Sequence, residues 1–259
     1  MIFDITILPG FDKNGCKEQY TYIKLKAGDT VSIVGPTGSG KTALISDIEL
    51  LAQGDTSTKR RIFVNGEVPS DEIRFNPAMK PIVMITQNTK CFADLTTEEF
   101  LQIHARARKI YDKQVIQKTI DLANNFTGEK IKKDTRVTVL SGGQTRSLLI
   151  ADAIMVGASP IILLDEIENA GIFKQEVVNL IHKAGKMVVF VTHDPVIALL
   201  TKTRIIMENG AVKKVLYQNE PEIRAAQSLL ELDKKIGTIR EELRAGKSIT
   251  FDLPAVNYA

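Results

Sequence analysis

Short apolar runs bounded by turn-forming residues recur along most of the chain and predict strands. Residues 2–34 contain several such runs, separated by glycine-containing turns, which predicts a β-rich beginning. The segments 61–66 and 81–86 also predict strands. The runs 161–164 and 187–191 are apolar at every position, as expected for interior strands of a parallel sheet. The pattern therefore predicts an α/β core with a β-rich N-terminal part.

Residues 88–140 have a helical pattern instead. Thr96 and Glu99 have the spacing of a capping box, in which each side chain hydrogen-bonds a free N–H group at a helix start. A second helical stretch is expected at about 113–124. His104 follows the capping box, and we interpret it as a helix-surface residue rather than a ligand. This block predicts a helical lobe inserted into the α/β core.

The C-terminal stretch predicts one long helix. Pro221 can open this helix, and Gly237 weakens it by about 1 kcal/mol relative to alanine. Apolar residues recur at alternating spacings of four and three: Ala225, Leu229, Leu232, Ile236, Ile239 and Leu243. This stripe needs a partner surface, either on the chain's own domain or on another chain. We expect one domain over 1–217, with the lobe at about 88–140, and a C-terminal helix and tail over 218–259.

The candidate chemistry begins at Gly35–Thr42, which reads Gly-Pro-Thr-Gly-Ser-Gly-Lys-Thr. An apolar strand over 31–34 precedes it and a helical pattern follows it, the context that separates a phosphate-binding loop from a chance match. Its glycines let the backbone approach a ligand, and N–H groups at the helix start can converge on phosphate oxygens. Lys41 can reach the β- and γ-phosphates, and the Thr42 hydroxyl can bind Mg²⁺. The predicted phosphate-binding residues are Gly35, Pro36, Thr37, Gly38, Ser39, Gly40, Lys41 and Thr42.

Composition narrows the class of protein. The chain has 259 residues, 44% hydrophobic and 25% charged, which is typical of a soluble globular protein. Its net charge of +3 makes no strong case for nucleic-acid binding. Cys16 and Cys91 lack the spacing of a metal site, which suits a reducing compartment. No signal-peptide pattern opens the chain and no apolar run approaches the roughly 20 residues that cross a bilayer, so we expect a cytoplasmic protein.

Further motifs follow the phosphate loop in a characteristic order. Gln87 ends a predicted strand, and Leu140–Gln144 reads Leu-Ser-Gly-Gly-Gln before a helix. Asp165 and Glu166 end the next apolar strand, and His193 follows the strand after that. This set resembles the nucleotide-binding domain of ATP-binding cassette (ABC) ATPases: Walker A, Q-loop, signature, Walker B with its glutamate, and switch histidine. The resemblance covers roughly residues 2–217. It implies a P-loop NTPase (RecA-like) core with an N-terminal antiparallel β part and an inserted α-helical lobe.

The resemblance also implies that the chain binds MgATP and hydrolyses ATP. Asp165 would hold Mg²⁺ through water, and Glu166 would orient or deprotonate the attacking water. His193 would contact the γ-phosphate. These groups follow the carboxyl ends of predicted parallel strands, where open α/β sheets place their ligands. The implied catalytic residues are Lys41, Gln87, Glu166 and His193, and the implied metal-site residues are Thr42, Gln87 and Asp165.

In the family that the chain resembles, the signature faces the nucleotide of another subunit. Ser141, Gly142 and Gly143 at a helix start form an anion site of the same physical kind as the phosphate loop, and Gln144 completes the motif. The resemblance therefore implies a homodimer, or a pair with a related ABC subunit. Two ATP molecules would lie between the two chains.

More than one aromatic residue is a candidate for binding the base. Members of the family often stack adenine on an aromatic residue upstream of the phosphate loop, and Phe11 is our candidate. Tyr20 and Tyr22 are alternatives that lie closer to the loop. Phe11 is interpreted equally well as a buried residue of a β-turn.

Two segments depart from the family pattern. The run 167–172 lacks the aspartate of the usual D-loop, which puts the cross-dimer contact of that loop in doubt. In the signature helix, Arg146, Ser147 and Asp152 stand where importers tend to carry Gln, Arg and Arg. The catalytic positions are intact, so ATP hydrolysis is expected to survive.

Two functions are compatible with the resemblance. One is an ATP-hydrolysing subunit, peripheral at the inner face of the membrane, that drives a separate membrane permease. The lobe supports it, because Gln87 and residues 95–98 are similar to the segment that transporter ATPases press against membrane helices. The other is a soluble ABC ATPase that remodels a protein or ribonucleoprotein, which the altered 167–172 run and the heptad-like tail support. A DNA-repair or structural-maintenance ATPase is disfavoured, because no long coiled-coil insertion precedes the signature.

Overall fold

The computed structural model describes residues 3–86, 88–112, 114–166 and 185–248. The chain divides into two units, Met1–Gln218 and Asn219–Ala259.

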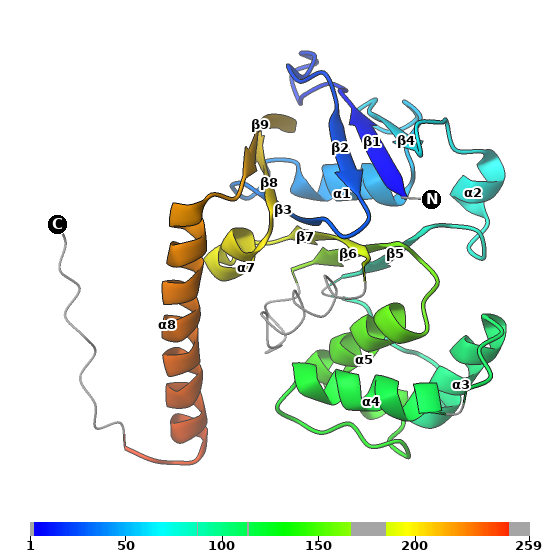
Figure 1. The fold of residues 1–259 in the computed structure, drawn as a ribbon, viewed down its shortest axis with the longest axis vertical. Coiled ribbons are helices and arrows are strands. Elements are labelled where there is room, and N and C mark those ends of the chain that lie inside the picture. The colour runs from blue at the N-terminus through cyan, green and yellow to red at the C-terminus, as the bar shows by residue number, and fades with distance from the viewer. Residues whose placement is uncertain (1–2, 87, 113, 167–184, 249–259) are drawn as a thin grey trace. The chain divides into compact units, whose positions relative to one another are not determined.

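The centre of the first unit is a six-stranded sheet with strand order β5-β6-β7-β3-β8-β9 (Figure 1). Neighbours from β5 to β8 pair in parallel, and only β9 runs antiparallel, to β8. The expected interior parallel strands are therefore confirmed. Because β3 lies between β7 and β8, the loop that follows β3 leaves from the middle of the sheet. The strands are β3 (Thr30–Val34), β5 (Ile82–Ile85), β6 (Ile161–Asp165), β7 (Met187–Val191), β8 (Thr203–Glu208) and β9 (Ala211–Tyr217).

A second, antiparallel sheet forms the β-rich beginning of the chain. It contains β1 (Asp4–Leu8), β2 (Ile23–Lys26) and β4 (Arg61–Val64) in the order β2-β1-β4. Ile5 and Ile7 on the central strand are fully buried, and the alternating residues Asp4, Thr6 and Leu8 are less so, because successive side chains of a strand point to opposite faces. The expected antiparallel N-terminal part is confirmed.

The six-stranded sheet separates two hydrophobic cores. Along β6, Ile161 and Leu163 pack with helix α1 (Lys41–Glu49) and the antiparallel sheet, whereas Ile162 and Leu164 pack with the helical lobe. All four side chains are fully buried, and each burial contributes about 1.5–3 kcal/mol. In Figure 1, α1 lies on one side of this sheet and the lobe helices lie on the other. Both faces of β6 are covered, which explains its continuous apolar sequence.

The helical lobe contains α3 (Thr97–Ala107), α4 (Gln114–Phe126), the short 3₁₀ helix η1 (Val137–Val139) and α5 (Gly142–Met155). The capping box predicted at the start of α3 is confirmed. The backbone N–H of Glu99 donates to Oγ1 of Thr96 at 3.2 Å, and the N–H of Thr96 donates to Oε2 of Glu99 at 2.8 Å.

The expected surface position of His104 needs correction. Its side chain is only 32% exposed, and its Nδ1 lies 2.7 Å from Oδ2 of Asp152 on α5. The ring also packs against Phe100, with 4.2 Å between ring centroids. The spacing along α3 could not reveal this pair, because its partner lies 48 residues away on another helix.

Three further helices complete the described chain. The short helices α2 (Asp71–Phe75) and α7 (Pro195–Leu200) belong to the first unit. Helix α8 (Glu220–Arg244) forms the second unit, with Pro221 in its first turn as predicted. Among the residues that can be described, we find no helix with the length and apolar character that a bilayer span requires.

Candidate functional site

The phosphate loop connects β3 to α1, as its sequence predicts. Gly40 is the residue that caps α1, and its φ of 100° lies in the left-handed region that favours glycine. A Cβ atom at Gly40 would lie 2.7 Å from the Cα of Gly210, in the turn between β8 and β9. A Cβ at Gly35 would lie 2.4 Å from the carbonyl oxygen of Met207. Both positions therefore require glycine for close backbone packing.

Lys41 is the first residue of α1 and is buried. Its Nζ donates to the carbonyl oxygens of Gly35 at 2.9 Å and Pro36 at 3.1 Å, so the ammonium group folds back over its own loop. Burial lowers the pKa of Lys41, against the opposing effect of the Glu166 and Asp165 carboxylates. An anionic phosphate would offer this ammonium group stronger acceptors than the two carbonyls.

The side chain of Ser39 indicates that the loop fits a nucleotide phosphate. Its side chain is buried, and its Oγ has no hydrogen-bond partner within the part of the chain that the structure describes. A buried hydroxyl without a partner is costly, and a phosphate oxygen at the loop would satisfy it. Pro36, Thr37, Gly38 and Thr42 are exposed around it. The loop therefore combines an accessible rim with buried donors, which fits a phosphate ligand.

The acidic and histidine candidates lie at the same edge of the sheet. Asp165 is the last residue of β6, Glu166 follows it, and His193 comes two residues after β7. His193 Nε2 lies 3.5 Å from Glu166 Oε1, and both side chains are partly exposed. Since β7 pairs with both β6 and β3, these groups follow strand ends beside the phosphate loop. The structure thus brings Lys41, Asp165, Glu166 and His193 to one edge.

The backbone of Glu166 has a feature that its motif does not reveal. Its φ is 50°, a left-handed conformation that costs about 1–2 kcal/mol for a residue with a side chain. The N–H of Glu166 donates to the carbonyl oxygen of Val191 at 3.0 Å, which holds this conformation against β7. Such strain is concentrated at functional sites.

The signature residues occupy the start of α5 in the lobe. Ser141 caps this helix: its Oγ accepts from the N–H of Gln144 at 3.3 Å, and Oε1 of Gln144 accepts from the N–H of Ser141 at 2.9 Å. Ser141 and Gly142 are exposed, and Gly143 is partly exposed. These hydrogen bonds stay within the helix start. The exposed backbone leaves this end of α5 accessible to another molecule.

The aromatic candidates for base binding differ in their surroundings. Phe11 is 42% exposed, so the alternative of a buried turn residue is wrong. Tyr20 is partly buried and donates to Oε2 of Glu18 at 3.3 Å, and burial raises its pKa. Tyr22 is 59% exposed. Lys13 connects the segment of Phe11 to the phosphate loop, because its Nζ donates to the carbonyl oxygen of Gly38 at 2.6 Å.

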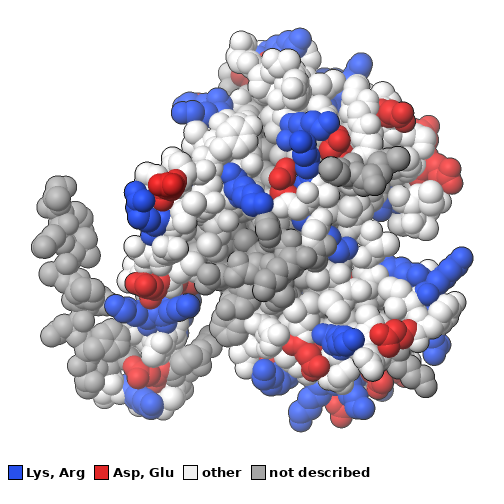
Figure 2. Space-filling view, in the orientation of Figure 1, with Lys and Arg blue, Asp and Glu red and all other residues white. Residues whose placement is uncertain are grey.

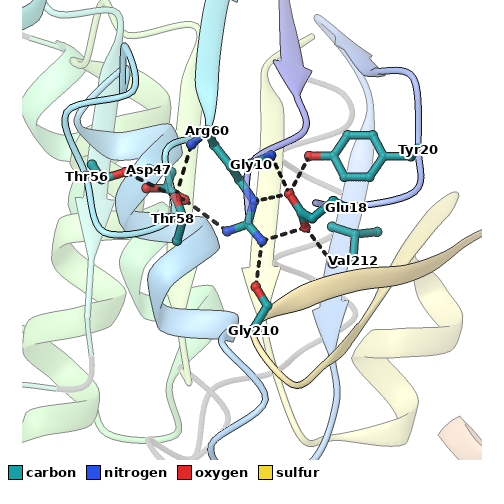
Figure 3. Close-up of polar contacts among 9 residues, drawn as sticks. All are labelled: Gly10, Glu18, Tyr20, Asp47, Thr56, Thr58, Arg60, Gly210 and Val212. Atoms are coloured by element: carbon teal, nitrogen blue, oxygen red, sulfur yellow. Dashed lines mark hydrogen bonds and ion pairs between the residues drawn. The ribbon is translucent and has the colours of Figure 1, made fainter. Parts of the chain in front are cut away.

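A buried polar cluster near the phosphate loop was missed by the sequence analysis. Figure 3 shows Arg60 between the carboxylates of Glu18 and Asp47. All three side chains are at most 2% exposed. Glu18 lies 42 residues before Arg60 and Asp47 lies 13 before it, so local periodicity carries no signal for this cluster.

Some predicted features lie outside the described residues, namely Gln87 and the altered run 167–172. Over 3–86, 88–112, 114–166 and 185–248, no group of three or more His, Cys, Asp or Glu side chains could hold a metal ion. Mg²⁺ is commonly held by one or two protein ligands together with substrate phosphates, so such a cluster is not needed for MgATP. On the face shown in Figure 2, basic and acidic side chains are interspersed.

The central parallel strand β3 leads into a glycine-rich loop with a buried lysine, and an acidic pair lies at the end of β6, two strands away in the same sheet. These features define a P-loop nucleoside triphosphatase. The comparisons identify the family. The family model described as "ABC transporter" matches residues 20–169. The ABC transporter ATP-binding protein MJ0121 of Methanocaldococcus jannaschii is 49% identical over 251 residues, 97% of this chain and 96% of that protein. The chain belongs to the ABC transporter family, as an ATP-binding subunit and an ATP hydrolase.

More distant relatives have the same kind of sequence and fold. The thiamine import ATP-binding protein ThiQ of Brucella suis is 29% identical over 197 residues, 73% of this chain and 78% of that protein. The structure of CbiO1 from Clostridium perfringens, part of the cbiONQ transporter complex, has a TM-score of 0.63 and 22% identity, covering 92% of this chain and 98% of that one. The dimeric structure of the ATP-binding cassette MJ0796 with ADP and Pi has a TM-score of 0.62 and 22% identity, covering 85% of this chain and 99% of that one. These likenesses confirm the expected P-loop fold.

Proposed function

We propose that the chain hydrolyses MgATP between two subunits and thereby drives a separate membrane permease. The observation that carries this proposal is the buried Lys41 ammonium group, which shares one sheet edge with the Asp165 and Glu166 carboxylates and with His193. Phosphoryl transfer needs positioned positive charge and a positioned water more than covalent chemistry. This edge supplies groups for both.

Each residue has a defined part in this proposal. Lys41 and the backbone N–H groups of residues 35–42 hold the ATP phosphates. Thr42 and Asp165, together with Gln87, would hold Mg²⁺, which supplies further positive charge to the phosphates. Glu166 orients or deprotonates the attacking water, and His193, 3.5 Å from it, is placed to contact the γ-phosphate.

The second half of the nucleotide site would come from a second subunit. At the start of α5, Ser141 and Gly142 are exposed and Gly143 and Gln144 are partly exposed, and a helix start is favourable for an anion. In this proposal the phosphate that they bind belongs to the nucleotide of a partner chain. The subunit is a homodimer partner or a related ABC chain.

A permease partner fits the relatives, whose names describe import and transporter proteins. The described helices include none that could span a membrane, so the partner would supply the crossing. In this proposal the chain would act at the cytoplasmic face of a membrane. The alternative, a soluble ABC ATPase that remodels a macromolecule, is one outcome of the test below.

Glu166→Gln tests the catalytic assignment. We expect ATP hydrolysis to fall by roughly 10²–10⁴-fold, because the amide cannot act as a base, while ATP stays bound and the dimer accumulates. Phosphate release and light scattering measure these effects.

Lys41→Ala should lose nucleotide binding instead. The exposed Glu208, which pairs with Lys213 at 2.7 Å, provides the control variant Glu208→Gln with unchanged activity. Near-normal hydrolysis by Glu166→Gln would refute the assigned role.

The partner is tested by isolating the tagged chain from its own cells after detergent extraction of membranes. We expect a multi-helix membrane protein to be recovered with it in a constant ratio. A chain that remains in the membrane-free fraction and hydrolyses ATP fully without a partner would support the remodelling alternative.

A further inference from the structure

A fully buried arginine links the segments around the phosphate loop. Arg60 immediately precedes β4 and is 0% exposed. Its Nε donates to Oε2 of Glu18 at 2.8 Å, and its Nη2 donates to Oε1 of the same carboxylate at 2.7 Å. This two-point contact is the strongest and most directional geometry for an arginine–carboxylate pair.

The remaining hydrogen bonds of the Arg60 guanidinium group reach two other segments. Its Nη1 donates to Oδ2 of Asp47 on α1 at 3.0 Å, and its Nη2 also donates to the carbonyl oxygen of Gly210 at 2.8 Å. Figure 3 shows these contacts radiating from one guanidinium group. Asp47 belongs to the helix that begins at the phosphate loop. The N–H of Gly210 donates to the carbonyl oxygen of Ser39 at 2.8 Å, so this turn rests on the loop itself.

Glu18 connects the same group to the segment that carries Phe11. Oε2 of Glu18 accepts from the N–H of Gly10 at 2.8 Å, and Oε1 accepts from the N–H of Val212 at 2.7 Å. The N–H of Phe11 donates to the carbonyl oxygen of Thr58, two residues before Arg60, at 2.8 Å. The guanidinium thus lies between the loop of residues 10–18 and the loop that binds phosphate.

Stability alone is a poor explanation for this cluster. Removing two carboxylates and a guanidinium from water costs several kcal/mol per ion. Well-packed apolar residues in place of such a cluster often give the same or greater stability. What a rigid arginine fork adds is a fixed geometry, which the flexible ammonium of lysine cannot reproduce. The arrangement therefore indicates that the relative position of the bridged segments matters for function.

We propose that Arg60 is a positioning residue for the nucleotide, which holds the Phe11 segment at one distance from the phosphate loop so that base and phosphates bind together. Arg60 does not touch the nucleotide in this proposal. The inference rests on the proposed function, in which the phosphate loop binds ATP, and it takes the exposed Phe11 as the candidate that stacks on the base.

The test compares two triphosphate probes, of which only one carries an adenosine group and therefore a base. Mg²⁺-ATP and Mg²⁺-tripolyphosphate both reach the phosphate loop, but only ATP reaches Phe11. For Arg60→Lys we expect the Kd of ATP to rise about tenfold, within the range for losing a base–aromatic stack, and the Kd of tripolyphosphate to change less than about twofold. The exposed neighbour Arg61 gives the matched control Arg61→Lys, for which neither Kd should change. Calorimetry measures all of these values.

A double-mutant cycle shows whether Arg60 acts through Phe11. Phe11→Ala should weaken ATP binding by itself, and adding Arg60→Lys to it should have little further effect. Should Arg60→Lys not fold, Glu18→Gln carries the same test, since it removes the charge on the Phe11 side and leaves Arg60 paired with Asp47.

Equal losses for ATP and tripolyphosphate, or additive effects in the cycle, would overturn the inference about Arg60. A wild-type chain that binds ATP no more tightly than tripolyphosphate would instead overturn the candidate role of Phe11 in base binding, and a chain that binds neither probe would overturn the proposed function. These failures are therefore distinguishable.

Discussion

The starts of α1 and α5 are both glycine-rich and both proposed to bind the phosphates of ATP, yet they are built differently. Gly40 at the start of α1 has no side chain to cap the helix, and Lys41 follows it in a buried position. At the start of α5, Ser141 and Gln144 cap each other. Free N–H groups at a helix start need a partner, so α1 is incomplete without an anion whereas α5 is largely self-sufficient. The start of α1 therefore depends on a bound anion to satisfy its N–H groups, whereas the start of α5 is stable before any ligand binds.

The largest expected effect is at the α1 start. Gly40→Ala adds a methyl group 2.7 Å from the Cα of Gly210 at a residue with φ of 100°. We expect a loss of about 2–3 kcal/mol in the free energy of unfolding and loss of ATP binding, measured by urea unfolding and calorimetry. Gly38→Ala is the matched control, because φ there is 77° but no atom lies within 4 Å of the added carbon. It should cost only about 1 kcal/mol. Equal effects of both variants would refute the packing argument.

At the α5 start we expect a smaller and more selective effect. Ser141→Ala should lower the free energy of unfolding by about 1 kcal/mol through the lost cap, and should reduce ATP hydrolysis by the dimer while leaving ATP binding to the monomer unchanged. Unfolding, calorimetry and phosphate-release assays separate the three quantities. Thr96→Ala removes the equivalent cap of α3 and should cost the same stability with normal hydrolysis. If both variants hydrolysed ATP equally well, Ser141 would be a cap and nothing more.

The α1 side should also be the more sensitive to acid, although this effect is the smallest. Burial raises the pKa of Glu18, but the hydrogen bonds and charge of Arg60 outweigh it and leave the pKa below the usual 4.5. A lowered carboxyl pKa contributes stability that is present above the unfolded-state value and is lost as pH falls through the folded-state value. The free energy of unfolding should therefore decrease below about pH 4.5, and Glu18→Gln should flatten this decrease. Urea titrations between pH 3 and 7 on the two proteins measure it, and parallel pH profiles would contradict it.

The features that the sequence predicted are those encoded locally. The phosphate loop, the capping box at Thr96 and the apolar strands β6 and β7 each follow from residues within one element. The features that were missed depend on residues that meet only in the folded chain, such as Arg60 with Glu18 and His104 with Asp152. The left-handed backbone of Glu166 was also missed, since its cause is a hydrogen bond to Val191 on another strand. Spacing along one element carries no information about such partners.

The alternation along β6 has a practical consequence for engineering. Leu163 and Leu164 are adjacent, yet the first belongs to the core beneath α1 and the second to the core of the helical lobe. Replacing Leu163 with a smaller residue would loosen the packing beneath α1, next to the phosphate loop. Replacing Leu164 would loosen the packing of the lobe that carries the signature. Substitutions at adjacent positions of one strand can thus change the rigidity of either core separately.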